Sequence, residues 1–232
     1  MQYLDTLNEA QKEAVLMTDG PILILAGAGS GKTKTITHRI LHLIAQGVAP
    51  ESILAITFTN KAAKEMRERV EHALDNEQVL NLPMTLSAQK SRPFMSTFHS
   101  LGVHILKENA VTLGIPRHFT IFDKNDSKRA VKDAIEKIGL DPKQFEPAKI
   151  MNAISREKGN FVTAGEYEAN AGNEYMPKII SRIWNEYEHI LTEEKSLDFD
   201  DLLLKTARLL KNSPEVRALY QEKWKYIHID EY

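Results

Sequence analysis

The chain has 232 residues, of which 42% are hydrophobic and 27% are charged, and these ordinary values exclude a wholly disordered protein. Its 30 Lys and Arg residues against 32 Asp and Glu residues give a net charge of −2, which excludes an overall attraction to DNA or membranes but not a local basic groove. Because the chain contains no cysteine, disulfides, thiolate zinc sites and cysteine nucleophiles are excluded.

The N-terminal segment MQYLDTLNEA contains acidic residues and no apolar stretch, so it is not a secretory signal. It leads into a first predicted helix, on which Gln11 would be exposed. The longest apolar run of the chain, ILILA, is far too short to span a bilayer. We therefore expect a soluble, cytoplasmic protein that has no membrane partner.

The first hundred residues alternate between predicted strands and predicted helices. The apolar run at 21–26 predicts a buried strand, and the apolar spacing of 32–46 predicts a helix that ends at Gly47. After these we predict a strand at 53–58, a helix at 61–74, a polar irregular stretch at 75–92, a strand at 93–98 and a helix at about 99–109. This alternation indicates an open parallel sheet with right-handed crossovers.

The middle of the chain is predicted to be helical, most clearly at 127–139, 148–159 and 177–191. We interpret residues 113–191 as a helical subdomain inserted into an α/β domain that is formed by residues 1–112 and 192–232. A further helix at 198–211 begins with acidic residues, which suit the helix dipole and need no metal ion. The run KYIHID at 225–230 predicts a return to the sheet as a last strand.

The strongest functional signal is the segment AGAGSGKT at residues 26–33. A predicted strand leads into it and a helix leaves it, which is the context that a phosphate-binding loop requires. Backbone N–H groups and the helix N-terminus would face the phosphates, Lys32 would reach the β- and γ-phosphates, and Thr33 would bind Mg²⁺. The alternative is a glycine-rich turn that merely caps a helix. We predict that ATP is bound by Ala26, Gly27, Ala28, Gly29, Ser30, Gly31, Lys32 and Thr33.

The last predicted strand runs into Asp230 and Glu231. A P-loop enzyme needs an acid at the tip of a second strand to hold Mg²⁺, and a neighbouring carboxylate can accept a proton from the attacking water. We therefore predict Thr33 and Asp230 as metal ligands, and Glu231 and Lys32 as catalytic residues. Because many strands end in a solvated acid, this prediction depends on the P-loop.

Six segments together resemble UvrD/Rep/PcrA-like superfamily 1 DNA helicases and occur in the order found in that family. They are LNEAQKEAV (7–15), AGAGSGKT (26–33), ITFTNKAAKEMRERV (56–70), STFHSLGVHIL (96–106), LDFDDLL (197–203) and IDEY (229–232). The resemblance implies the first RecA-like domain of an ATP-driven motor that moves 3′ to 5′ on single-stranded DNA. The implied fold class is α/β, a P-loop NTPase with a RecA-like parallel sheet, incomplete at the C-terminus, and an inserted all-helical subdomain.

The resemblance also implies site residues, with ATP and Mg²⁺ as cofactors. Gln11 matches the glutamine that reads the adenine edge. The DNA-contacting motifs of the family match Thr57, Phe58, Thr59, Asn60 and Lys61, and further along Thr97, Phe98 and His99. An aromatic ring offers a stacking face to a base, although the alternative for Phe58 and Phe98 is packing in the core. The implied partner is single-stranded DNA or a single/double-strand junction.

Every family motif after the Asp-Glu pair is absent, so we expect a fragment that lacks the C-terminal half of its parent protein and hydrolyses ATP poorly. In this family a strand that follows Asp-Glu in sequence separates the P-loop strand from the Asp-Glu strand. We therefore expect residues 22–25 and 226–229 to lack that neighbour, and to leave an open slot or a distorted pairing.

Three other interpretations stay open. A helicase-nuclease subunit of the RecB or AddA kind shares these motifs. A P-loop kinase would need a phosphate-acceptor site and a lid. A non-catalytic module would bind nucleotide or DNA without turnover.

Outside the motifs, Trp184 and Tyr187 are interpreted as core or hinge packing, and His228 as a buried or sheet-face histidine.

Overall fold

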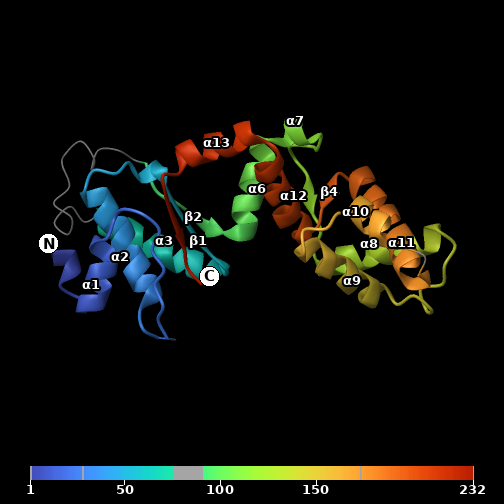
Figure 1. Cartoon of the computed structure of the whole chain (residues 1–232), viewed down its shortest axis with the longest axis horizontal. Coiled ribbons are helices and arrows are strands. Elements are labelled where there is room, and N and C mark those ends of the chain that lie inside the picture. Colours follow the sequence, from blue (N-terminus) through green and yellow to red (C-terminus); the bar gives the residue numbers. More distant parts are fainter. Residues whose placement is uncertain (1, 28, 76–90, 173, 232) are drawn as a thin grey trace. The chain divides into compact units, whose positions relative to one another are not determined.

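The structure is a computed structural model that describes residues 2–27, 29–75, 91–172 and 174–231 (Figure 1). The chain divides into two compact units, which we call the sheet unit (Met1–Phe98 with Ala218–Tyr232) and the helical unit (His99–Arg217). The helical unit includes more residues at both ends than the predicted insertion at 113–191. The assignment of these two units as domains remains a prediction. None of the described helices is long and apolar enough to cross a membrane.

The sheet unit contains a three-stranded parallel sheet in the order β2-β1-β5. Its strands are β1 (Ile53–Thr57), β2 (Phe94–Thr97) and β5 (Tyr226–Ile229), as Figure 1 shows. All five residues of β1 are buried, as expected for a central strand. Because the strands are parallel, their carboxyl ends meet at one edge of the sheet. The predicted parallel sheet is confirmed for these three strands.

The helices of the sheet unit include α1 (Glu9–Leu16), α2 (Lys32–Ala45) and α3 (Asn60–Asp75), and α6 (Phe98–Glu108) begins at its edge. Two short 3₁₀ turns cover Gln2–Leu4 and Pro50–Ser52. The apolar spacing that predicts the second helix also supplies the core. Buried side chains of α2 pack with those of β1 and α3, among them Ile40, Leu43, Ile44, Ile53, Met66 and Val70.

Residues 21–26 do not form a strand, so that prediction is wrong. A strand is stabilised by hydrogen bonds to a neighbour, and among the described residues no strand pairs with this segment or lies between it and β5. Leu23 and Leu25 are accordingly 72% and 86% exposed instead of buried. Because 22–25 forms no strand, the expected open slot or distorted pairing between two strands, 22–25 and 226–229, is not observed.

The helical unit contains the remaining elements. Its helices are α7 (Ala110–Leu113), α8 (Lys124–Lys137), α9 (Pro147–Gly159), α10 (Ala164–Asn170), α11 (Tyr175–Glu193) and α12 (Phe199–Asn212), and α13 (Pro214–Lys223) begins in this unit. A small parallel pair joins β3 (Thr120–Ile121) to β4 (Ser196–Leu197), which the sequence did not predict. Trp184 and Tyr187 are buried in the core of α8, α9 and α11, so their interpretation as core residues is confirmed.

A buried ion cluster joins α9, α11 and α12 in the helical unit. The side chain of Lys158 is 1% exposed, and its Nζ lies 2.7 Å from Glu188, 2.8 Å from Asp198 and 3.0 Å from Asp201. Burial by itself lowers the pKa of Lys158, but the three carboxylates outweigh it and raise that pKa well above its ordinary value. Lys158 is therefore charged. It is the nearest cation to these three acids, and the half-buried Lys205 lies farther away, 3.6 Å from Asp201 and 3.9 Å from Glu188.

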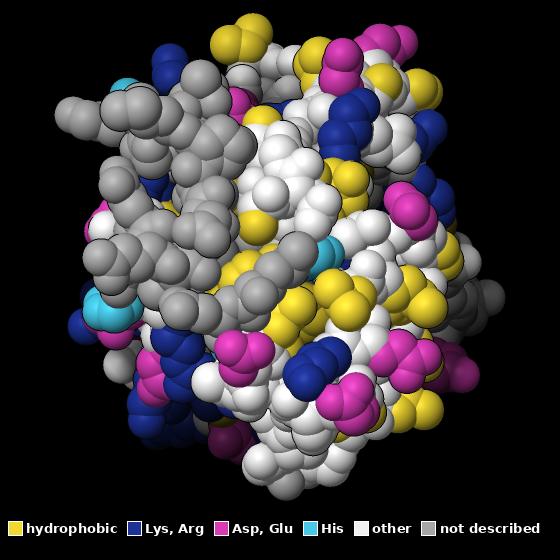
Figure 2. Space-filling view, turned by 90° about the vertical axis from the view of Figure 1, so that its left-hand side faces the viewer, with side chains coloured by type: hydrophobic (Ala, Val, Ile, Leu, Met, Phe, Trp, Pro, Cys, Tyr) yellow, Lys and Arg dark blue, Asp and Glu magenta, His cyan; other side chains and the backbone are white. Residues whose placement is uncertain are grey.

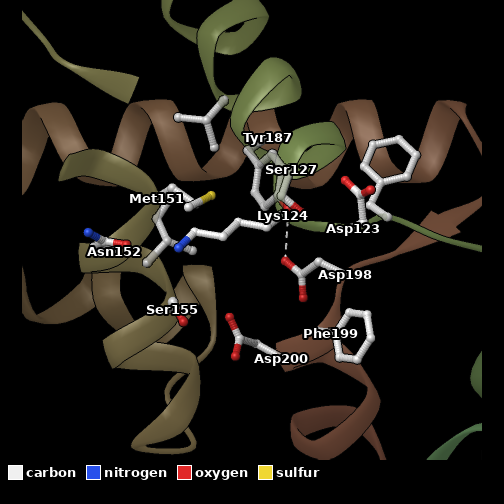
Figure 3. A pocket seen from close by; sticks show the side chains of 13 residues that line it. Asp123, Lys124, Ser127, Met151, Asn152, Ser155, Tyr187, Asp198, Phe199 and Asp200 are labelled. Carbon is white, nitrogen blue, oxygen red and sulfur yellow. Dashed lines mark hydrogen bonds between the residues drawn. The ribbon is translucent and has the colours of Figure 1, made fainter. Parts of the chain in front are cut away.

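A pocket of about 410 Å³ is lined in part by Asp198 of the ion cluster (Figure 3). It is lined by residues of α8, α9, α11 and the start of α12, and Tyr187 donates a hydrogen bond to Asp198 at 2.9 Å. Asp198 is also the N-cap of α12, where it accepts from the backbone N–H of Asp201 at 2.7 Å. Asp198 and Asp201 at the start of α12 therefore serve as helix cap and ion-cluster members.

Candidate functional site

In the segment at residues 26–33, the described residues before Lys32 lie outside helices and strands, and Lys32 and Thr33 begin α2. Gly29 and Gly31 have φ angles of +74° and +86°, in the left-handed region that favours glycine. A Cβ atom on Gly31 would lie 2.8 Å from Nε2 of Gln11, so the flexible end of the Gln11 side chain would have to move. Ala28 lies outside the described residues.

The Lys32 side chain folds back onto this loop. Its Nζ donates hydrogen bonds to the carbonyl oxygens of Ala26 and Gly27, each at 2.9 Å, and Ser30 Oγ donates to Gly27 O at 2.7 Å. Ala26, Gly27, Gly29 and Ser30 are all exposed, which leaves them accessible to a ligand. The ammonium group of Lys32 thus holds the start of the predicted phosphate-binding loop, which leads into a helix N-terminus with its partial positive charge.

Thr33 and Asp230 are brought together from opposite ends of the chain. Thr33 Oγ1 donates to Asp230 Oδ2 at 2.9 Å across 197 positions. Asp230 is buried, and its backbone N–H donates to Ile56 O at 2.8 Å, which fixes it at the tip of β5. Glu231 follows, exposed and with φ +66°. The fold therefore places the two predicted metal ligands in direct contact and the predicted general base beside them.

Gln11 lies against the same loop. Asn8 is the N-cap of α1, and its backbone N–H donates to Gln11 Oε1 at 3.1 Å. Nε2 of Gln11 donates to the carbonyl oxygen of Ser30 at 3.0 Å. The structure therefore brings the glutamine predicted to read adenine next to the predicted phosphate-binding loop.

The predicted DNA-contacting residues lie at the carboxyl ends of β1 and β2, where Thr57 and Thr97 are register partners. Both threonines are buried, but Phe58 is 63% exposed and its ring lies 5.4 Å from that of Phe98 at 60°. The exposure of Phe58 contradicts the alternative that it packs in the core. The exposed ring of Phe58, with the partly buried ring of Phe98 beside it, is suited to stacking with a base.

The other predicted DNA-contacting residues start helices. Thr59 Oγ1 accepts from the backbone N–H of Ala62 at 3.1 Å, and the exposed Asn60 and Lys61 open α3. His99 belongs to the helical unit, where its ring lies 5.2 Å from that of Phe199. Burial lowers the pKa of His99, and the charge of Asp200 opposes this shift only in part. His99 is therefore neutral at pH 7.

On the molecular face shown in Figure 2, Lys and Arg side chains are interspersed with Asp and Glu side chains and with hydrophobic ones. This mixture agrees with the net charge of −2. Among the described residues, no group of three or more His, Asp and Glu side chains is arranged to hold a metal ion. The Thr33 and Asp230 pair has the hard oxygen ligands that Mg²⁺ prefers, usually together with waters and phosphate oxygens, so these residues fit that ion.

Sequence reasoning missed two buried cations, Arg39 and Lys158. Neither belongs to a motif. A signal for Arg39 exists, because it is a charge on an otherwise apolar face of the 32–46 helix, between Ile36 and Ile40. Nothing in the sequence around Lys158 points to three carboxylates that lie far away along the chain.

Comparison of the sequence with family models and with curated proteins identifies the same helicase family in both cases. The family described as UvrD/REP helicase N-terminal domain matches residues 7–232. The chain is 44% identical over 228 residues to "ATP-dependent DNA helicase PcrA" of Staphylococcus epidermidis, which covers 97% of this chain and 29% of the relative. It is 44% identical over 232 residues to the protein of that name from Bacillus subtilis, covering all of this chain and 30% of the relative. The chain thus spans about 30% of the length of these curated relatives.

Proposed function

Because the chain belongs to the UvrD/REP helicase N-terminal domain family, we propose that it is the ATP-binding part of an ATP-dependent DNA helicase. The parent protein would couple ATP hydrolysis to 3′ to 5′ movement on single-stranded DNA or at a single/double-strand junction. The names of the curated relatives favour this function over a P-loop kinase. Because the chain spans about 30% of those relatives, we infer that further segments of a longer parent complete the catalytic site.

One observation carries the proposal for the nucleotide site, which is the 2.9 Å contact between Thr33 and Asp230. It supports a RecA-like P-loop arrangement, in which the hydroxyl at the helix start and the carboxylate at a strand tip hold Mg²⁺. When bound, this ion would neutralise charge on the phosphates. Lys32 would bind the phosphates, Gln11 would bind the adenine edge, and Glu231 would accept a proton from the attacking water.

We expect the Lys32→Ala variant to bind Mg-ADP about 1.5–3 kcal/mol more weakly than wild type. This is the free energy that a hydrogen bond to a charged group usually contributes. Titration calorimetry of the purified chain measures this. Lys64→Ala is the matched control, since Lys64 is an exposed lysine of the same unit whose ion pair with Glu68 is 3.7 Å long. Equal affinity of wild type and Lys32→Ala would refute the proposed nucleotide site.

A second expectation concerns DNA. Phe58→Ala should weaken binding of a single-stranded oligonucleotide by about 1–3 kcal/mol, the usual value of one base–aromatic stack. Thermal stability should change little, because the ring is 63% exposed. Tyr175→Ala removes an aromatic ring that is 65% exposed on α11 and serves as the control. Fluorescence anisotropy with equal losses in both variants would show that Phe58 is not a specific contact.

A further inference from the structure

The helix that carries Gln11 is poorly anchored by apolar packing. α1 has eight residues, and Val15 is its one buried side chain. A helix of this length is not stable by itself in water, since its nucleation is unfavourable and few hydrogen bonds follow. The position of Gln11 therefore depends on specific contacts that hold α1 in place.

Polar side chains of α2 supply several of those contacts along the N-terminal segment. Lys34 Nζ donates to the carbonyl oxygen of Thr6 at 2.6 Å, just before α1. His42 Nδ1 lies 2.8 Å from the hydroxyl of Tyr3. These contacts fix the chain on the N-terminal side of α1, and a separate contact is needed for its C-terminal end.

Arg39 makes that contact. Its side chain is buried, and Nη1 donates to the carbonyl oxygen of Ala14 at 2.7 Å and also to that of Met17. The last carbonyls of a helix have no partner within the helix and carry partial negative charge. α1 has no basic residue in its own last turn, so Arg39 of the neighbouring helix provides the cation.

The guanidinium of Arg39 contacts the carbonyl groups at the end of α1. Among the described residues, no carboxylate forms an ion pair with it. Burial, together with the charge of Arg39, lowers the pKa of His42, so this histidine is neutral at pH 7. An apolar side chain could fill this space without placing a charge in the interior, so a buried guanidinium that binds two carbonyl groups indicates a positional role.

We propose that Arg39 is a positioning residue for nucleobase specificity. It holds the C-terminal end of α1 against α2, and in this way it keeps Gln11 beside Ser30 of the loop at residues 26–33. This inference rests on the proposed nucleotide site. It predicts that Arg39 affects the base-binding part of the site and leaves the phosphate-binding part unchanged.

The test compares Mg-ADP, Mg-UDP and pyrophosphate as ligands of the 232-residue chain by titration calorimetry. Wild type should prefer ADP to UDP. Arg39→Met should bind ADP about tenfold more weakly, which corresponds to the loss of about one net hydrogen bond, while UDP and pyrophosphate affinities stay close to wild type. A merely structural defect would weaken all three ligands together.

Arg67→Met is the matched control, because Arg67 Nη2 donates to a backbone carbonyl, that of Met95 at 2.7 Å, but does not contact α1. It should keep the wild-type ratio of ADP to UDP affinity. If Arg39→Met does not fold, Arg39→Lys takes its place and should lower the same ratio, since an ammonium reaches the two carbonyls less well.

An unchanged ratio in the folded Arg39 variant would overturn the inference, as would an equal fall of the ratio in Arg67→Met. A wild-type chain that binds pyrophosphate but does not distinguish ADP from UDP would overturn the inference and leave the phosphate site standing. A wild-type chain that binds none of the three ligands would refute the proposed function itself.

Discussion

Replacing Lys158 with methionine is expected to lower the free energy of unfolding by about 3–5 kcal/mol near neutral pH, the usual cost of removing one partner from a buried ion pair. The side chain of Lys158 is 1% exposed and lies within 3.0 Å of Glu188, Asp198 and Asp201. Methionine fills a similar volume but removes the nearest cation from these carboxylates, and only Lys205 stays close, 3.6 Å from Asp201 and 3.9 Å from Glu188. Urea denaturation measured by circular dichroism gives the change.

The loss of stability in Lys158→Met should become smaller as the pH falls. Burial raises the pKa of Asp201 to about 6, despite the nearby ammonium of Lys158. A carboxyl whose folded-state pKa exceeds its unfolded value binds more protons when folded, so its protonation favours folding as the pH falls through about 6 towards 4. Removal of Lys158 raises that pKa further. The difference between Lys158→Met and wild type should therefore shrink between about pH 7.5 and pH 5.5.

Lys137 provides a matched control in the helical unit. Its Nζ lies 3.3 Å from Glu186 and 3.4 Å from Glu193, but the lysine side chain is 49% exposed. Because water solvates these groups, Lys137→Met should change stability far less than Lys158→Met. Equal effects of the two substitutions, or a loss that grows as the pH falls, would contradict the assignment of the stability to the buried ion cluster.

Gly102→Ala should destabilise the chain by about 3 kcal/mol, at the upper end of what overpacking usually costs. A Cβ atom on Gly102 would lie 2.6 Å from the backbone oxygen of Leu202 and 3.2 Å from Thr206 Oγ1, so α6 and α12 would have to separate. This steric effect opposes the helix propensity of alanine, which alone would stabilise by about 1 kcal/mol.

The opposite sign is expected at Gly165 in α10. A Cβ atom there would have no neighbour within 4 Å, so Gly165→Ala should stabilise by about 0.5–1 kcal/mol. Both variants are compared by urea denaturation. If Gly102→Ala proves neutral or stabilising, the close approach of α6 to α12 at this position is not required by the fold.

Helices and strands could be predicted from the sequence where the pattern of apolar residues matches the residues that are buried in the structure. β1, β2 and β5 were predicted from short apolar runs, and the helices at 32–46 and 177–191 from their apolar spacing. The run at 21–26 has the same pattern, but strand formation also depends on a hydrogen-bonded neighbour, which no local sequence window reveals. That segment is therefore exposed coil, even though its composition predicts a buried strand.

The candidate site was predictable where a motif links residue type to a local conformation. Gly31 has the left-handed backbone that a tight loop before a helix needs, and Thr33 follows at the helix start. The contact between Thr33 and Asp230 brings together the two residues that the P-loop and the acid at the strand end predict as metal ligands, and their role as ligands stays a prediction. Arg39 and Lys158 could not be predicted, because their partners are backbone carbonyls and distant acids that only the tertiary structure brings near.

The division of the sheet unit into two chain segments has a consequence for the order of folding. Asp230 reaches Thr33 only after β5 has docked on β1, which joins residues 197 positions apart. Closing so long a loop has an entropic cost that must be met before the contact can form. During synthesis, the glycine-rich loop leaves the ribosome long before its carboxylate partner. The nascent chain would therefore bring Thr33 and Asp230 together only late in folding, and a ligand that needs both residues would select molecules in which β5 has docked on β1.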